Sequence, residues 1–289
     1  MHTTKGHMVP QTDSRQGGSF SSQGLLGGTA IRGRAKESWI YDVYWRLVDP
    51  RIVEDRDKEV HFYRDLLKSL RRGDLIFDIG ANQGYKAGIF LRLGARVVAV
   101  EPDDASQETL RRRFLTYRLR KKKLVIVPKA VSDRSSVEVL WIDTPGGAKN
   151  TLSRKWVEAL SGDDNRFGER LQFGRRKEVE TVSMNDLISA YGAPFFIKID
   201  VEGHELSVLR GLKQPVPYLS FEVNLPEFRT EGGECIKTLN AVDPDGVFNY
   251  TPDCRRGLVL QSWVHDAEIA AILDSCTDES IEIFWKTRP

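Results

Sequence analysis

Residues whose types suit ligand binding gather at the end of one apolar run. The run "LIFD" ends in Asp78 and is followed by "IGANQGY", which contains Gly80, Asn82 and Gly84. Glycine adopts positive φ without strain and lets another group approach the backbone, and asparagine is among the few other residues that tolerate such angles. The helical pattern that follows begins with N–H groups that have no partner inside the helix. This order of strand, turn and helix predicts a ligand site, although a tight strand-to-helix connection alone explains the glycines too.

A second acidic residue follows the next apolar run at a suitable distance. The run "RVVAVEP" contains Glu101, 23 residues after Asp78. An acid at the end of the second strand of such a unit accepts hydrogen bonds from the hydroxyls of a ribose, whereas a purely structural Glu101 would stabilise the start of the helix after Pro102. The dinucleotide fingerprint G-x-G-x-x-G is absent, and the carboxylate of Asp78 repels phosphates but suits an ammonium group. These features favour S-adenosylmethionine over a nicotinamide dinucleotide.

The stretch "FFIKIDVEGHELSVLRGL" crowds ionisable residues at the end of another apolar run. They are Lys198, Asp200, Glu202, His204 and Glu205. Charged groups at the carboxyl ends of strands in an open sheet lie beside the ligand crevice, where they serve chemistry better than stability. We therefore expect catalytic residues in this stretch.

Three of the acidic or titratable residues are candidate general bases. His204 titrates near neutral pH, and its alternative interpretation is a solvent-facing residue at a helix start. Asp200 and Glu222, the latter in the run "YLSFEVN", are rival bases. Lys198 is either part of the site or a buried ion-pair partner of one of these acids. Asn150 either contacts a ligand or caps its own loop.

The elements that position these residues are short, β-branched apolar runs separated by helical stretches. Such a pattern is typical of strands buried on both faces and joined by crossover helices, so we expect an α/β fold with a doubly wound, mostly parallel sheet. The runs are "LIFDIG", "RVVAVEP", "LVIVPKAV", "FFIKIDVEG" and "YLSFEVN". Two further strands, "VEVLWID" and "KEVETVS", flank a polar insertion whose loop can cover a site. The segments "GVFNYT", "DAEIAAILD" and "SIEIFWKT" complete the sheet near the C-terminus.

Composition divides the chain and limits its partners. Residues 1–34 are rich in glycine, serine and glutamine and are expected to form a flexible leader, residues 35–72 a helical preface, and residues 73–289 the main domain. A net charge of +2 gives no argument for a nucleic-acid or membrane partner, and no segment approaches the roughly 20 apolar residues of a membrane span. The three cysteines lack metal-ligand spacing and predict neither a zinc site nor a disulfide framework, as in a cytoplasmic protein.

Taken together, the segments resemble the FkbM family of S-adenosylmethionine-dependent methyltransferases. The matching segments run in order from about residue 74 to residue 224: "FDIGANQGY", "VVAVEPD", "KAVSD", "GGAKNTLS", "VETVSMNDL", "IKIDVEGHELSVLRG" and "LSFEVN". The resemblance implies a class I, Rossmann-like methyltransferase sheet whose last strand, "IEIFWKT", is antiparallel. It also implies methyl transfer to a hydroxyl oxygen of a small molecule, a sugar or a glycan.

The resemblance assigns expected functions to individual positions. The first cofactor motif corresponds to Asp78, Gly80, Asn82 and Gly84, the ribose-binding acid to Glu101, and the wall of the adenine site to Ala130 and Val131. The motif that borders methyl donor and acceptor corresponds to Asp200, Glu202, Gly203 and Glu205. Lys86 departs from the family pattern because it adds a charge just after the glycine turn.

A basic run supports one alternative function. The run "RRRFLTYRLRKKK", residues 111–123, has eight basic residues and no acid, with Phe114 and Tyr117 among them. We interpret it as the solvated side of a helix, and the alternative is a non-catalytic nucleic-acid-binding module. A nicotinamide-dependent oxidoreductase, the other alternative, requires the missing glycine fingerprint.

Overall fold

The computed structural model describes residues 50–119, 123–161 and 171–288. The leader and the first part of the expected helical preface, residues 35–49, lie outside these ranges. The remainder of the preface contains α3 (Pro50–Leu66). No helix in the described ranges has both the length and the apolar character needed to cross a membrane.

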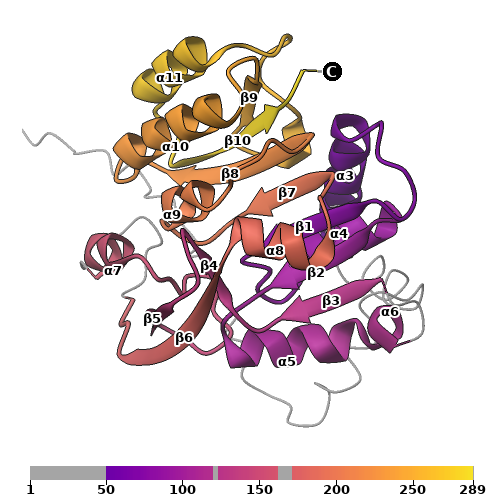
Figure 1. The fold of residues 1–289 in the computed structure, drawn as a ribbon, viewed down its shortest axis with the longest axis vertical. Coiled ribbons are helices and arrows are strands. Elements are labelled where there is room, and N and C mark those ends of the chain that lie inside the picture. The colour runs from indigo at the N-terminus through magenta and orange to yellow at the C-terminus, as the bar shows by residue number, and fades with distance from the viewer. Residues whose placement is uncertain (1–49, 120–122, 162–170, 289) are drawn as a thin grey trace, which may run out of the picture.

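A seven-stranded sheet forms the centre of the fold (Figure 1). Its strand order is β3-β2-β1-β7-β8-β10-β9, and all neighbouring pairs are parallel except those that β10 makes with β8 and β9. This confirms the expected doubly wound, mostly parallel sheet with an antiparallel last strand. The strands are β1 (Leu75–Ile79), β2 (Arg96–Val100), β3 (Leu124–Val127), β7 (Phe196–Ile199), β8 (Tyr218–Asn224), β9 (Val247–Thr251) and β10 (Ser280–Lys286).

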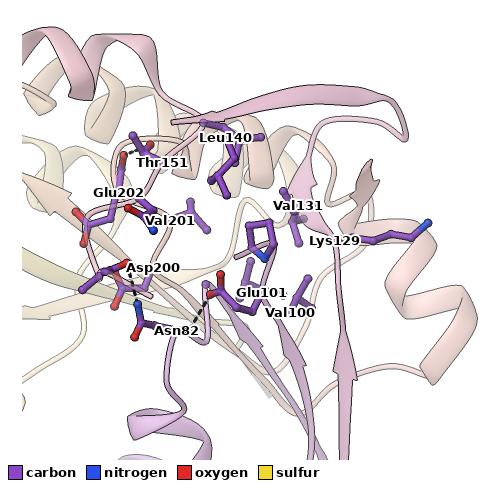
Figure 2. Close-up of a pocket in the computed structure, with 18 residues that line it drawn as sticks. Asn82, Val100, Glu101, Lys129, Val131, Leu140, Thr151, Asp200, Val201 and Glu202 are labelled. Atoms are coloured by element: carbon purple, nitrogen blue, oxygen red, sulfur yellow. Dashed lines mark hydrogen bonds between the residues drawn. The ribbon is translucent and has the colours of Figure 1, made fainter. Parts of the chain in front are cut away.

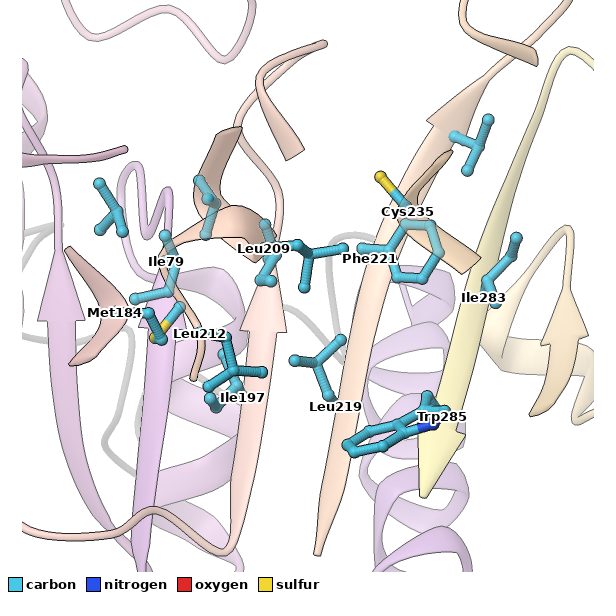
Figure 3. Packing of buried hydrophobic residues seen from close by; sticks show 14 of the residues in the cluster. Ile79, Met184, Ile197, Leu209, Leu212, Leu219, Phe221, Cys235, Ile283 and Trp285 are labelled. Carbon is cyan, nitrogen blue, oxygen red and sulfur yellow. The ribbon is translucent and has the colours of Figure 1, made fainter. Parts of the chain in front are cut away.

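Helices cover both faces of this sheet, because alternate residues of each strand point to opposite sides. On one face, α3 and α4 pack against the apolar cluster that contains Phe196 and Phe284. On the other, α8 to α11 pack around Phe221, Ile283 and Trp285. Figure 3 shows Leu209 and Cys235 close to Phe221 in this cluster. The helices in the described ranges are α3, α4 (Tyr85–Arg92), α5 (Asp104–Arg113), α6 (Leu115–Leu119), α7 (Arg154–Leu160), α8 (Met184–Tyr191), α9 (Glu205–Arg210), α10 (Arg229–Val242), α11 (Asp266–Ser275) and the 3-10 turn η1 (Cys254–Arg256).

One expected strand is divided in the structure. The run "LVIVPKAV" forms β3 and, after Pro128, the separate strand β4 (Ala130–Ser132). Proline has no N–H to continue the ladder, and the chain turns here into a three-stranded sheet of order β4-β6-β5. The strands expected around the polar insertion, β5 (Val137–Ile142) and β6 (Arg175–Ser183), supply the other two members. This small sheet carries the insertion to the carboxyl edge of the large sheet.

Candidate functional site

The glycine turn is shaped first by contacts inside the protein. Gly80 and Asn82 have φ values of +77° and +45°. A Cβ atom on Gly80 would lie 1.8 Å from the carbonyl oxygen of Asp200, and one on Gly84 would lie 2.5 Å from the side chains of Leu110 and Phe114. The two glycines therefore let the end of β1 approach the end of β7 and let α4 begin against α5. These contacts agree with the structural alternative, a tight strand-to-helix connection.

A pocket opens beside this turn, and we call it the turn pocket (Figure 2). Its lining includes Gly80, Asn82, Glu101, Ala130, Val131, Asp200 and Glu202. These residues come from the ends of β1, β2 and β7 and from β4. Seven of the expected cofactor and site residues thus meet at one pocket, whereas Asp78 and Gly84 lie outside its lining.

Glu101 holds the turn in position. Its Oε2 accepts a hydrogen bond from the N–H of Asn82 and its Oε1 accepts one from the N–H of Asp103, both at 2.8 Å. Burial raises the pKa of Glu101 to about 7, although the two N–H donors act in the opposite direction. Each carboxylate oxygen has a further lone pair, so Glu101 can still accept hydrogen bonds from a ligand in the turn pocket.

Asp78 is buried directly below the turn, with 2% of its surface exposed. Its carboxylate accepts a hydrogen bond from the N–H of Ala87, but Oδ2 has no hydrogen-bond partner among the described residues. Burial raises the pKa of Asp78 to about 7, and the neighbouring charge of Lys198 opposes that rise. A buried acceptor without a partner is costly, and a donor from a ligand would satisfy it.

The loop of the polar insertion covers the turn pocket. Asn82 Nδ2 donates to the carbonyl oxygen of Gly147 at 3.1 Å, and Gln83 Nε2 donates to that of Gly146 at the same distance. Asn150 caps its own loop, because Nδ2 donates to the carbonyl oxygen of Thr144 and Oδ1 accepts the N–H of Asp143. Asn150 also lines the turn pocket, so its contact with a ligand stays a prediction beside the loop contacts that the structure shows.

The motif after β7 forms a tight turn at the other side of the pocket. Glu202 has a φ of +54°, and its carbonyl oxygen accepts a hydrogen bond from Thr151 Oγ1 at 2.7 Å. Glu205 is buried and its Oε1 accepts the N–H groups of Val201 and Gly203, both at 3.2 Å. Burial raises the pKa of Glu205 to about 7. Glu205 thus braces the turn.

His204 lies apart from the other candidate bases. Its Nε2 is 3.2 Å from Ser132 Oγ and 3.8 Å from Glu138 Oε2, so its partners belong to the small sheet and its connections. Burial lowers the pKa of His204, while the charge of Glu138 acts in the opposite direction. The imidazole is not part of the lining of the turn pocket. A function of His204 as a base stays a prediction.

A second cavity, which we call the charged pocket, adjoins the first at Asp200. It lies where the α3-facing side of the sheet reaches the carboxyl ends of β7 and β8. In addition to Asp200, its lining consists of Glu59, Lys86, Lys198, Glu222, Ser280, Glu282 and residues 251–255. Asp200 is therefore common to both cavities.

Lys198 neutralises part of this acidic cluster. It is 2% exposed, and its Nζ lies 3.3 Å from Asp200 Oδ2 and 3.7 Å from Glu282 Oε1. Burial works against the charged form, yet the carboxylates of Asp200, Glu282 and Glu222 raise the pKa of Lys198 well above its ordinary value. The structure shows Lys198 as a buried ion-pair partner. Because it also lines the charged pocket, its part in the functional site stays a prediction.

Glu222 and Glu282 are direct cross-strand neighbours on β8 and β10. Like charges at such positions repel, and burial together with the charge of Asp200 raises the pKa of Glu222 to about 8. Burial also acts on Asp200, but the charge of Lys198 and a hydrogen bond with Glu222 hold the pKa of Asp200 below its ordinary value. The environment therefore raises the pKa of Glu222 and lowers that of Asp200, so that near neutral pH Glu222 is mostly protonated and Asp200 is ionised.

Several residues of the charged pocket were not found from the sequence. Glu59 belongs to α3 and Cys254 to η1, far apart in the sequence. Cys254 Sγ donates to Glu282 Oε2 at 3.2 Å. Glu282, an acid between apolar residues of "SIEIFWKT", was the feature of the sequence that could have indicated this pocket. The position of Lys86 is now explained, because its Nζ forms an ion pair with Glu59.

The basic run is largely accounted for by contacts within its own region. Arg112 pairs with Glu108 at 2.7 Å, Arg111 donates to Gln107, and Phe114 is fully buried against the sheet. These contacts agree with the solvated side of a helix. Residues 120–122 lie outside the described ranges.

Comparison with protein families identifies the chain. A model of the methyltransferase FkbM domain matches residues 78–243, which is more than half of the 289-residue sequence. The chain belongs to the FkbM methyltransferase family. Membership confirms the resemblance that the motifs indicated and, with it, S-adenosylmethionine as the cofactor. No curated protein matches the sequence at the level taken as significant.

Solved structures of methyltransferases resemble the FkbM chain at low identity. The methyltransferase FkbM of Methylobacillus flagellatus KT is 18% identical with a TM-score of 0.44, and the match covers 74% of this chain and 44% of that one. The chain thus spans less than half the length of that protein. The putative RNA methyltransferase PH1948 of Pyrococcus horikoshii is 13% identical with a TM-score of 0.39, and the match covers 80% and 82% of the two chains.

The residues at the turn fit S-adenosylmethionine. Glu101 offers acceptors for ribose hydroxyls in the turn pocket. Asp78, in contrast, is buried outside the lining of this pocket, so its expected contact with the ammonium group stays a prediction. Ala130, Val131 and Leu140 give the turn pocket an apolar wall for an adenine ring. These are the residues that would hold the cofactor.

Proposed function

We propose that this FkbM-family protein transfers a methyl group from S-adenosylmethionine to a hydroxyl oxygen of a polar small molecule, sugar or glycan in the charged pocket. The observation that carries the proposal is the position of Asp200, which lines both the turn pocket and the charged pocket. A polar acceptor is supported by the carboxylates and cations of the charged pocket, because these groups form hydrogen bonds with hydroxyls.

The chemistry divides between the cofactor and the carboxyl groups. When bound, S-adenosylmethionine supplies a methyl group on a positively charged sulfur, which an oxygen nucleophile can displace. The protein has to orient the acceptor hydroxyl and accept its proton. Glu222 suits proton transfer, because a base with a pKa of about 8 is both strong and partly ionised near neutral pH. Asp200, ionised beside Lys198, is able to accept a hydrogen bond from the same hydroxyl.

Glu222 has more structural support as the base than His204 does. Glu222 lines the charged pocket together with Asp200, whereas the imidazole of His204 contacts Ser132 and Glu138. Proton transfer by a positioned side chain contributes a factor of roughly 10² to 10⁴ to a rate. If Glu222 is the base, a variant at Glu222 therefore loses this factor and a variant at His204 keeps it.

The test measures transfer of labelled methyl groups to a panel of monosaccharides, oligosaccharides and hydroxylated small molecules. For Glu222→Gln we expect turnover to fall by roughly 10² to 10⁴ with unchanged affinity for S-adenosylhomocysteine. In the wild type, the rate should rise as the pH passes through about 8, and Glu222→Gln should lose that rise. Glu268→Gln, on the exposed side of α11, is the matched control. Full activity of Glu222→Gln combined with loss in His204→Ala would transfer the function of base to His204.

A further inference from the structure

Residues 143–150, which we call the insertion loop, form one wall of the turn pocket. Gly147, Ala148 and Asn150 contribute to this wall. The loop connects β5 with α7 and belongs to neither sheet, whereas other walls of the pocket come from the ends of β1, β2 and β7. The insertion loop is therefore held in place by contacts other than strand pairing.

The base of the insertion loop is fixed. Trp141 and Thr151, on either side of the loop, form an antiparallel bridge with main-chain hydrogen bonds of 2.8 and 3.0 Å. Thr151 is buried, and its Oγ1 donates to the carbonyl oxygen of Glu202. A loop whose ends lie this close together is a compact unit. Its tip can therefore move while its base stays in place.

Two side chains of the glycine turn hold the tip of the loop. Asn82 Nδ2 donates to the carbonyl oxygen of Gly147, and Gln83 Nε2 donates to that of Gly146, both at 3.1 Å. Gln83 is exposed and Asn82 is half-buried, so water competes for both hydrogen bonds. Each of them on its own contributes only modestly to keeping the tip in this position.

Asp103 is the third contact of the tip, and it is 3% exposed. Its Oδ1 accepts the N–H of Gly146 at 3.0 Å and the N–H of Ser106, in the first turn of α5, at 2.9 Å. Its Oδ2 accepts a hydrogen bond from Asn150 Nδ2 at 3.2 Å. Asp103 thus fastens the insertion loop to the start of α5.

These contacts lead directly to the acid that is expected to bind the ribose. The main-chain N–H groups of Asn82 and Asp103 donate to the two carboxylate oxygens of Glu101. The same two residues hold the loop with their side chains. A ribose that binds Glu101 therefore arrives next to the contacts that keep the loop in place.

The turn pocket is small with the loop in this position. Its volume is about 50 Å³, which is enough for a few water molecules. Sites for small molecules usually have volumes of about 300 to 1,000 Å³. An adenosyl group therefore needs more room than the pocket offers until the tip of the loop moves away.

We propose that the insertion loop is a gate of the turn pocket, which Asn82, Gln83 and Asp103 hold closed and which the adenosyl group of the cofactor displaces. The closed gate and the cofactor then compete for the same space. Because only molecules with an open gate bind, a variant that loses a contact of the closed gate has a higher affinity for the cofactor. The inference takes the turn pocket as the place of the adenosyl group and does not depend on the acceptor proposed above.

Gln83→Ala tests the gate without altering the lining of the turn pocket, to which Gln83 does not belong. We expect this variant of the full chain to bind S-adenosylhomocysteine about two- to tenfold more tightly than the wild type in calorimetry, since the closed gate loses one hydrogen bond. Surface plasmon resonance should show the gain in the association rate constant, because opening precedes binding. Gln261→Ala, at an exposed position after β9, is the matched control and should bind like the wild type.

Asp103→Ser removes the other main contact of the gate. Serine is as good an N-cap as aspartate, so α5 keeps an acceptor for its first turn, but the shorter side chain lacks the second oxygen that holds Asn150. The double variant Gln83→Ala/Asp103→Ser should bind S-adenosylhomocysteine at least about tenfold more tightly than the wild type. A cooperative thermal transition shows that each variant is folded.

Hydrogen exchange of the wild type provides a measurement that needs no variant. Asp103 protects the N–H of Gly146 in the closed gate, so we expect the peptide with residues 143–150 to exchange faster when S-adenosylhomocysteine is bound. Unchanged or weaker affinity of the folded variants would overturn the inference. Unchanged or slower exchange of this peptide in the saturated wild type would overturn it too, because the loop would then stay closed with the ligand bound.

Discussion

Lys86 Nζ lies 2.6 Å from Glu59 Oε2, and this ion pair connects the helix after the glycine turn with α3. The side chains are 21% and 13% exposed, and the ammonium group also lies 5.4 Å from the centre of the Tyr63 ring. Lys86 departs from the expected motif, and this contact gives its physical reason. The charge points toward α3 and the charged pocket.

Removing one partner of this pair should destabilise the protein. We expect Lys86→Met to lower the free energy of unfolding by about 1 to 3 kcal/mol, because Glu59 would keep a largely buried charge without its partner. Urea denaturation provides the measurement. The double variant Glu59→Gln/Lys86→Met should lose less unfolding free energy than the sum of the losses in the two single variants. Strict additivity would show that the two side chains do not interact in solution.

Glu101 should decide cofactor affinity. For Glu101→Gln we expect binding of S-adenosylhomocysteine to weaken by about tenfold or more, since an amide replaces a carboxylate as acceptor of the ribose hydroxyls. Calorimetry measures the change. Glu108→Gln, an exposed carboxylate on α5, is the matched control and should bind like the wild type. Equal affinity of Glu101→Gln would argue against a ribose at this position.

The buried carboxyl groups should make stability depend on pH. Asp78 has a folded-state pKa of about 7, above its ordinary 3.8, so the folded protein keeps a proton that the unfolded chain has already released. This contribution is complete at low pH and is lost as the pH rises through about 7. When the pH rises from 5 to 8, we expect the free energy of unfolding of Asp78→Asn to fall by about 2 to 3 kcal/mol less than that of the wild type. Urea titrations at the two pH values measure the difference, and parallel losses would contradict the assignment.

Gly80 should tolerate no side chain. A Cβ atom would overlap the carbonyl oxygen of Asp200, and we expect Gly80→Ala to lose at least about 3 kcal/mol of unfolding free energy. Gly73 is a matched control, because it also has a positive φ, +96°, but no atom within 4 Å of its Cβ position. Gly73→Ala should lose only about 1 to 2 kcal/mol from backbone strain. A small loss at Gly80, measured by thermal unfolding, would mean that the ends of β1 and β7 can separate.

The sheet was predictable because each central strand is a short, continuous apolar run that is buried on both faces. The division between β3 and β4 was missed, although Pro128 marks it, since an apolar run alone does not show which sheet each half joins. The places of Glu101, Asp200 and Glu222 beside the cavities were predictable because each follows or ends an apolar run, whereas Asp78 lies outside the lining of both cavities. Their functions stay predictions. The charged pocket was not, because folding alone brings Glu59 next to β8 and β10.

The two cavities draw on different parts of the chain. The domain that defines the family covers residues 78–243, and it contains Glu101, Asp200 and the other named residues of the turn pocket. The charged pocket takes Glu59, residues 251–255, Ser280 and Glu282 from outside that range. If the acceptor lies in the charged pocket, as we propose, exchange of these flanking segments between relatives changes the choice of acceptor and leaves the residues of the turn pocket unchanged. A chimera that takes α3 and the β9–β10 region from a relative would test this, because it should use the acceptor of that relative.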